Sequence, residues 1–539
     1  MNKLLGFSHA ARWSLLGAIG SATLLVTPAA RAEEKSKKKD ETADVGLGLA
    51  PGSPQVGTLP GGIQPSYGQR SEDEQDYRFD YHGIIQMPLR AGLNKRTDAV
   101  GDQSKNVIHA PPVVPDYQDS FNYTTVVPQP YAQLAFSYGN NIVTGTAVIM
   151  ARTASTATSF FQPPLQSGIT DAFVTFHLPN VVSNGVIEAN VGAFSNAYGA
   201  MGEYDLGRYG TPIIGRINGV GETISARFAL GDLTIGVEQG LQGQFDKAPV
   251  GVPSEGWNAF AHPNEGTGLA HHEHLAIGYR RQATLGLHYI QAWTQDDRAD
   301  QVLQPDGTIT TLGADFRFSA SHLGHLYVGG AFTKADHAES VGRIIEIQNA
   351  VGGFGLMQNY LGPPDKSNRG TGSLLTIGGQ YDLSLAHLLL YPRTFDGKSH
   401  DLVLSAFGMF TRVESDDHSH PNGNYLHNRV NMLKFGAEAG YTLTSWFAFG
   451  GRLDHVSPQS EFKKERDFNI ISPRLIFRSD WQSRDQVVIQ YSKFLYGKHP
   501  LVRSGYPAVD EPGCGTSSSP STCTNPDADM VSISANMWW

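Results

Sequence analysis

The amino-acid sequence predicts an all-β fold, a transmembrane antiparallel up-and-down β-barrel of about 18 strands, with about 16 as the alternative number. Three observations lead to this prediction. Apolar and polar residues alternate along segments of about ten residues from Tyr77 onward. Short and long connections alternate between these segments, and the last segment ends on an aromatic residue. Successive side chains of a strand point to opposite faces, so this period gives each segment one apolar and one polar face.

The overall composition excludes several other classes of protein. Of the 539 residues, 40% are hydrophobic and 17% are charged, well below the charged fraction of about 25% found in soluble domains. No segment reaches the roughly 18 uncharged apolar residues of a membrane-spanning helix. The 2 cysteines are too few for a disulfide-built scaffold or a four-cysteine zinc site. A net charge of −10 speaks against nucleic acid as a partner.

The N-terminal region predicts export. Lys3 and Arg12 precede an apolar stretch over 14–26, which ends at the small-residue triplet Ala30-Arg31-Ala32. This layout is typical of a cleaved secretory signal peptide, which we place at 1–32. Residues 33–75 carry a charged run and then a Gly/Pro-rich stretch without strand or helix period, so we expect a flexible low-complexity leader there. The barrel is expected over 76–539.

The period of two is clear in segments along the whole of that range. In 131–138, for example, Leu134 and Phe136 share an apolar face, and Gln133 and Ser137 share a polar one. Further segments of this kind lie at 143–152, 171–178, 223–230, 311–319, 433–439 and 471–478.

The lengths of the connections fix the topology. Turns such as 139–141 and 231–232 are short, and one longer turn covers 384–400. The long connections lie at 93–129, 195–221, 243–271, 335–372 and 497–528. Tight turns at one end of the strands and long loops at the other are typical of barrels with short periplasmic turns and long extracellular loops.

The final segment carries the most specific motif. Apolar residues occupy every second position, and the chain stops on an aromatic: Val531, Ile533, Ala535, Met537 and Trp539. This resembles the C-terminal assembly signal of outer-membrane β-barrel proteins. A secreted β-sandwich that ends on Trp by chance is the alternative.

In overall architecture the chain resembles the outer-membrane porins of Gram-negative bacteria, from about residue 77 to 539, without matching one branch. The resemblance implies an outer-membrane location, membrane lipid and the barrel assembly machinery as partners, and a homotrimer. A barrel of sixteen to eighteen strands has a water-filled lumen. The expected function is therefore porin-type ion and solute transport, the passive diffusion of ions and small hydrophilic solutes.

Charged residues on the polar faces are expected to line this pore. For each of them the alternative is a cross-strand pair that only stabilises the wall. They are Arg152, Asp171, Glu188, Arg227, Glu238, Arg280, Asp315, Arg317, Lys434, Glu438, Arg452, Asp454, Arg474 and Arg478.

The connection at 195–221 is too apolar and aromatic for a free surface loop. It resembles in position and character the loop that porins fold into the lumen. That resemblance implies a constriction, and a subunit contact is the alternative. Its residues would be Tyr198, Glu203, Tyr204, Asp205, Arg208 and Tyr209. The stretch 353–357 is a second candidate for insertion.

The sequence gives weaker indications of a disulfide and of a metal site. Cys514 and Cys523 share one external loop in an oxidising compartment, where we expect a disulfide. Five histidines are weak metal candidates, because adjacent histidines on a strand face opposite ways and no His-Glu-x-x-His occurs. They are His271, His272, His274, His418 and His420. We expect no metal site and no cofactor.

The sequence leaves other functions open. A channel specific for a sugar or a metal complex is the first alternative, although only Phe173, Tyr327 and Phe407 are inward aromatics by parity. No Gly-x-Ser-x-Gly occurs in a strand-to-helix context, and we do not expect an enzyme. A barrel hydrolase and an adhesin or structural barrel remain as further alternatives.

Overall fold

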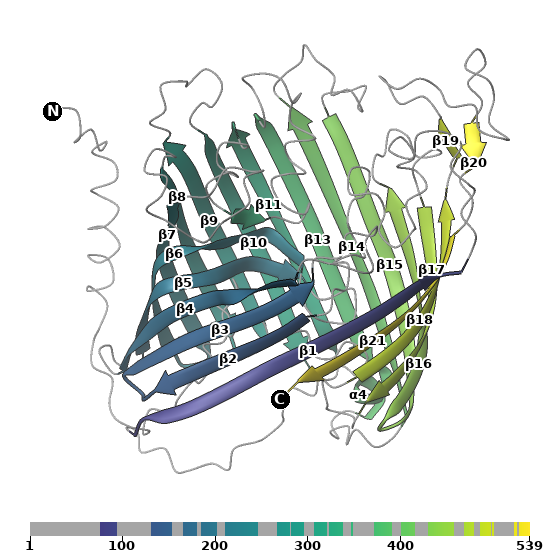
Figure 1. The fold of residues 1–539 in the computed structure, drawn as a ribbon, viewed down its shortest axis with the longest axis horizontal. Coiled ribbons are helices and arrows are strands. Elements are labelled where there is room, and N and C mark those ends of the chain that lie inside the picture. Colours follow the sequence, from purple (N-terminus) through teal and green to yellow (C-terminus); the bar gives the residue numbers. More distant parts are fainter. Residues whose placement is uncertain are drawn as a thin grey trace. The chain divides into compact units, whose positions relative to one another are not determined.

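The wall of the protein is built from long antiparallel β-strands (Figure 1). This computed structural model describes residues 76–93, 131–153, 165–179, 185–201, 211–245, 267–280, 282–295, 307–320, 323–337, 346–348, 371–390, 400–415, 429–457, 468–478, 486–496, 498–500, 522–524 and 528–538. The expected signal peptide and leader lie outside these ranges.

The strands follow one another along the chain as the sequence predicts. Their bounds are β1 (Arg78–Gly92), β2 (Tyr131–Gly139), β3 (Val143–Thr153), β4 (Leu165–Pro179), β5 (Gly185–Met201), β6 (Thr211–Leu230), β7 (Leu233–Phe245), β8 (Thr267–Tyr279), β9 (Ala283–Gln295), β10 (Thr308–Ala320), β11 (Gly324–Asp336), β12 (Glu346–Gln348), β13 (Gly372–Ser384), β14 (Asp401–Ser415), β15 (Arg429–Thr444), β16 (Phe447–Ser457), β17 (Phe468–Arg478), β18 (Gln486–Tyr496), β19 (Lys498–Pro500), β20 (Thr522–Thr524) and β21 (Ala528–Trp538).

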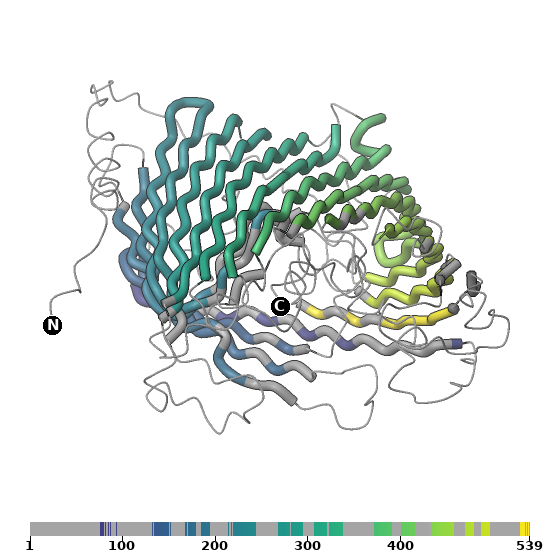
Figure 2. Tube along the Cα trace, turned by 90° about the horizontal axis from the view of Figure 1, so that it is seen from above, coloured from purple at the N-terminus to yellow at the C-terminus, as the bar shows by residue number. Residues whose placement is uncertain are grey.

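Strand pairing follows chain order around a ring. Each wall strand is antiparallel to the next, and β11 pairs directly with β13, so β12 is not part of the wall. Of the 21 strands, the three short ones, β12, β19 and β20, lie outside the wall. The other eighteen form the wall, and eighteen is the number that the sequence predicts. In Figure 2 the trace runs around the ring, and the last strand returns beside the first.

The first strand closes the ring. β1 pairs with β2 through Arg78–Gln86 and with β21 through Ile84–Gly92. The two sets of partners overlap at Ile84, Ile85 and Gln86 only. The pairings thus return to their start, and the antiparallel up-and-down barrel is confirmed.

The two faces of the wall differ as the period of two predicts. On β10, Leu312 and Phe316 are 56% and 38% exposed on the outer face, whereas Thr311 and Asp315 are buried on the inner face. An apolar outside and a polar inside are the arrangement of a barrel that spans a lipid bilayer. Closure removes the unpaired backbone groups that lipid could not satisfy.

Local sequence explains the turns. The Asn140 side chain accepts hydrogen bonds from the backbone N–H groups of Ile142 and Val143, which closes the β2–β3 turn. The longer turn after β13 holds a short helix, α4 (Leu385–Leu390). Ser384 Oγ accepts from the backbone of His387, and Asp401 accepts from that of Ala386. These two side chains cap the helix, so the turn is long because it contains a helix.

No helix within the described ranges is long and apolar enough to cross a membrane.

Candidate functional site

A long hairpin made by β5 and β6 leaves the wall and crosses the lumen. β4 pairs with β5 only up to Ala193, and β7 pairs with β6 only from Val220. Beyond these points β5 and the start of β6 pair with each other. Both strands come within 8 Å of β10, β11 and β13, which lie further around the ring. The segment 195–221, expected to be a loop, is therefore mostly strand, but it enters the lumen as expected.

Two glycines mark the place where the hairpin bends inward. Gly192 and Gly221 face each other in register. Gly192 has a φ of +141°, which L side chains rarely adopt. A methyl group at Gly192 would lie 2.3 Å from the carbonyl oxygen of Ala172, and one at Gly221 would lie 2.0 Å from that of Leu241. Only glycine lets the hairpin backbone pass this close to β4 and β7.

Apolar and polar contacts fix the hairpin at both ends. Ile214 lies against β10, where a methyl group at Gly313 would meet its side chain at 2.8 Å. Ile214 and Ile217 are 2% and 0% exposed. At the wall, Gln242 donates a hydrogen bond of 3.0 Å to the carbonyl oxygen of Phe194. The hairpin is thus held across the lumen.

A second connection adds to the obstruction. β12 pairs antiparallel with Arg216–Asn218, on the hairpin segment of β6 that lies before the pairing with β7 begins. It belongs to the connection between β11 and β13, which also contains 353–357. Those five residues lie outside the described ranges, so their expected insertion stays a prediction.

One side of the inner wall carries a histidine cluster: Glu238, His272, His274, His288, Asp315 and Arg317 on β7–β10. The Nε2 atom of His272 lies 3.3 Å from Glu238 Oε1, and that of His288 lies 2.5 Å from Asp315 Oδ1. The rings of His274 and His288 stack at 4.4 Å. The side chains of His272, His288 and Asp315 are 0% exposed.

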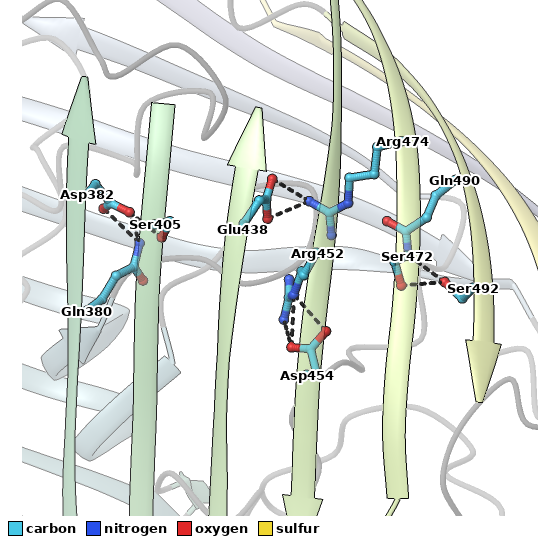
Figure 3. A network of polar contacts seen from close by, with 10 residues as sticks. All are labelled: Gln380, Asp382, Ser405, Glu438, Arg452, Asp454, Ser472, Arg474, Gln490 and Ser492. Atoms are coloured by element: carbon cyan, nitrogen blue, oxygen red, sulfur yellow. Dashed lines mark hydrogen bonds and ion pairs between the residues drawn. The ribbon is translucent and has the colours of Figure 1, made fainter. Parts of the chain in front are cut away.

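The other side carries an arginine cluster: Glu438, Arg452, Asp454 and Arg474 on β15–β17 (Figure 3). Arg474 donates two hydrogen bonds of 2.9 Å to the Glu438 carboxylate, across the intervening strand. Arg452 donates to Asp454 at 2.8–3.0 Å and lies 4.8 Å from the centre of the Phe407 ring. Arg452 uses two nitrogens and so forms a bidentate pair, which is short and fixed in geometry, whereas both bonds of Arg474 come from Nη1.

A third group joins β4, β5 and β6. Glu188 accepts from Arg227 at 2.8 Å and lies 3.1 Å from Nδ1 of His177. Next to it, Thr175, Asn190 and Thr223 form a chain of hydrogen bonds. The polar faces of these three strands are therefore connected by side-chain contacts as well as by the backbone.

Most of the predicted pore charges lie on the inner wall. In addition to the three groups, the structure places Asp171, Lys434 and Arg478 on β4, β15 and β17. Lys434 is 1% exposed, and the other two are half-buried. Arg152 belongs to β3, but its side chain is outside the described set. Several of these charged side chains form ion pairs with one another. This arrangement corresponds to the alternative in which such charges pair and stabilise the wall.

The prediction that Arg280 lines the pore is wrong. It lies in the turn between β8 and β9 with a φ of +50°, more than half exposed, and pairs with Asp232 of the neighbouring turn at 2.8 Å. Its hydrogen bond to Asp232 raises the pKa of Arg280. The turn begins one residue earlier than the sequence pattern indicates, so this arginine is not on the pore wall.

Several other predictions concern residues without described side chains. Tyr198 is part of β5, opposite Gly215, but its side chain is not described. Glu203, Tyr204, Asp205, Arg208 and Tyr209 lie outside the described ranges, as do Cys514, His418, His420 and Trp539. The constriction residues and the disulfide therefore stay predictions. Cys523 lies in β20, which pairs with β19.

The histidines of β8 split between the two faces, as expected for adjacent residues of a strand. His272 and His274 are buried on the inner face, and His271 lies on the outer face. In the described part of the chain, no group of three or more His, Cys, Asp and Glu side chains is arranged to hold a metal ion.

The sequence analysis missed several inner-wall residues. His288 of β9 completes the histidine cluster, and Gln380 donates to Asp382, which also accepts from Ser405. All have inward parity, which is the signal in the sequence that could have identified them. Of the three expected inward aromatics, Tyr327 and Phe407 are buried against Arg317 and Arg452.

Among solved structures, the chain is similar at low sequence identity to outer-membrane porins. The structure of OccAB1 from Acinetobacter baumannii is 9% identical with a TM-score of 0.39, covering 88% of this chain and 98% of that chain. OccK8 (OprE) from Pseudomonas aeruginosa is 10% identical with a TM-score of 0.38, covering 86% and 98%. OprD from the same organism is 8% identical with a TM-score of 0.36, covering 88% and 95%. No family model and no curated protein matches the chain.

Proposed function

From the barrel architecture that this chain has in common with outer-membrane porins, we propose that it is an outer-membrane channel for passive diffusion of ions and small hydrophilic solutes. The observation that carries the proposal is the β5–β6 hairpin, which crosses the lumen of a closed eighteen-strand ring and is held on both sides. Eighteen strands enclose more space than side chains alone fill.

The mechanism needs no covalent chemistry, and the proposal includes no enzymatic step. Polar side chains on the wall replace part of the hydration of a passing solute, and the hairpin limits its size. The histidine and arginine clusters act from separate parts of the wall, because their strands are four to nine positions apart in the ring of eighteen strands. Charges on walls of low dielectric constant focus the field on the narrow passage between them.

The location and assembly belong to the same proposal. The apolar outer face requires a bilayer, and the apolar periodicity of β21 fits a strand recognised by the barrel assembly machinery. We include export by a cleaved signal peptide at 1–32 and assembly into a homotrimer as parts of the proposal that await experiment.

Single-channel recording tests the proposal. We expect purified protein in a planar bilayer to give steady, stepwise current. Replacing residues 197–211 by a short turn should enlarge each step, because it removes the end of the hairpin that crosses the lumen. Replacing 251–265, which lies in the connection between β7 and β8, is a control of equal length and should leave the step unchanged. A folded, inserted barrel without current would contradict the proposal.

A substrate-selective channel is the second candidate. It is favoured by the two separate chain segments, the hairpin and β12, that narrow the lumen together. Such a channel would show current block that saturates with one class of solute, such as a sugar or a metal complex. Equal permeation of solutes of equal size would instead support general diffusion.

A further inference from the structure

The outer face of the barrel is largely apolar, and polar side chains on three adjacent strands form one continuous group on it. We call Gln239 of β7, His271 and Glu273 of β8, and Tyr289 and Gln291 of β9 the outer polar patch. Gln239, Glu273 and Tyr289 are register neighbours in one row, and His271 and Gln291 are register neighbours in the next. The patch is therefore continuous across three strands.

Apolar residues border the patch above and below. Val237, Leu275 and Leu287 lie on the side of the short turns, and Val237 and Leu287 are more than 40% exposed. Leu269 and Trp293 lie on the other side. The patch is thus enclosed in the apolar band and is not the edge of that band.

The depth of the patch follows from strand geometry. Glu273 is six residues from Tyr279, which ends β8 at the short-turn side. Six residues of a strand tilted by about 40° span about 15 Å along the barrel axis. The apolar band of such barrels is about 25 Å tall, so Glu273 is well inside it. Ionisable groups at this depth are costly against lipid and usually have a function.

Contacts within the patch satisfy only part of its polar groups. Tyr289 donates to Oε1 of Gln291 at 2.9 Å, and the ring of His271 packs edge-on against that of Tyr289 at 6.2 Å. His271 Nε2 lies 3.6 Å from Glu273 Oε1, longer than a hydrogen bond. The Glu273 side chain is still 54% exposed, so its carboxylate faces outward from the barrel.

We propose that the outer polar patch is the contact surface for a second copy of this chain. An occupant at this depth must itself lie in the membrane, because neither a soluble protein nor a lipid headgroup extends so far into the apolar band. The patch is also self-complementary. It carries carboxylate and amide acceptors together with amide N–H donors, so Glu273 of one copy can accept from Gln239 or Gln291 of another. The proposal rests on the membrane location in the proposed function, and not on conduction.

Site-specific photocrosslinking in cells tests this proposal. A benzophenone amino acid is placed at position 239 and, as a control, at position 404, where Leu404 is 37% exposed on the outer face of β14. We expect crosslinked peptide pairs in which both peptides come from this chain at position 239, and none at position 404. Crosslinks at position 239 to lipid or to another protein, or no crosslinks, would overturn the proposal.

A double substitution gives an independent measurement. In Gln239→Leu/Glu273→Leu the patch becomes apolar, and we expect the oligomer in mild detergent to dissociate to monomers that remain heat-modifiable and conduct. An unchanged oligomer would overturn the proposal. If the variant does not fold, the crosslinking result still decides. Absence of current in the wild-type protein would contradict the proposed function and leave the crosslinking result valid, so the two failures are distinguishable.

Discussion

The histidine cluster and the arginine cluster occupy separate parts of the inner wall and differ in the chemistry of their cations. In the first, the nearest partners of Asp315 and Glu238 are imidazoles, which have a neutral form, and Arg317 Nε lies farther away, 3.6 Å from Asp315. In the second, Glu438 and Asp454 face guanidinium groups, which stay charged. Buried carboxylates of one wall can therefore be paired in two ways, with an imidazole that can be neutral or charged, or with a guanidinium that is always charged.

The backbone accommodates the two clusters differently. Gly240 and Gly286 stand in register opposite His272 and Asp315, where methyl groups would lie 2.2–2.3 Å from those side chains. In the arginine cluster the register places Glu438 opposite Arg452, but each pairs with another residue, because the long arginine side chains reach past their register neighbours. The histidine cluster therefore depends on small residues, and the arginine cluster depends on side-chain length.

The largest expected effect comes from removing one carboxylate in each cluster. Asp454→Asn leaves the buried charge of Arg452 without its acid and should lower the free energy of unfolding by about 3–5 kcal/mol. Asp315→Asn should cost only about 1–3 kcal/mol, because the nearer partner of Asp315 is an imidazole, which has a neutral form, and the side chain of Arg317 is 25% exposed. Urea unfolding in lipid vesicles measures both.

The exposed pair of Arg280 and Asp232 supplies the control for that measurement. Asp232→Asn should leave the free energy of unfolding almost unchanged, because this pair is exposed to solvent. Equal losses for Asp454→Asn and Asp315→Asn would remove the distinction between the two clusters.

A smaller effect is expected from filling the space that the histidine cluster needs. Gly286→Ala places a methyl group against Asp315 and His288 and should lower the free energy of unfolding by about 1–3 kcal/mol. Gly451→Ala is the matched control, since a methyl group there meets nothing within 4 Å, and it should change stability by less than about 0.5 kcal/mol. If both variants behave alike, close packing is not what holds the histidine cluster.

The smallest effect concerns ion selectivity. Removing one fixed charge at about 10 Å from a passing ion in water changes its energy by about 0.4 kcal/mol, or about twofold in permeability. We expect Arg474→Gln to shift the reversal potential in a salt gradient toward cation preference at pH 8. His272→Gln should shift it less, because an imidazole, unlike a guanidinium, carries no permanent charge. A shift of equal size in both variants would show that the histidine cluster carries charge.

The sequence predicts the wall well, because a two-residue period and short turns are local properties. All the quoted segments lie within strands, and the strand number agrees. The hairpin was expected only in part, because the bend depends on the juxtaposition of Gly192 with Gly221 and on the fit of Ile214 to Gly313. Such contacts join residues far apart in the chain, and one sequence does not encode them as a pattern.

The pairing of charges was also beyond the sequence. Parity assigns Arg452 and Glu438 to one face, but it does not reveal that Arg452 binds Asp454 and that Glu438 binds Arg474. Arg280 shows the opposite limit. Strand β8 ends at Tyr279, one residue before the end that the sequence pattern indicates. This small difference moves Arg280 from the inner wall to the turn.

The short overlap at Ile84–Gln86 has a consequence for how the barrel is made. The first wall strand, β1, pairs with the last, β21. The ring therefore cannot close before the residues up to 538 are present. Bringing such distant segments together is slow, because the whole intervening chain must first be ordered. A chain that ends before β21 would keep two unpaired strand edges, which other chains can join. The small overlap means that β1 is displaced along its two neighbours, so one half of the strand is bonded to β2 and the other half to β21.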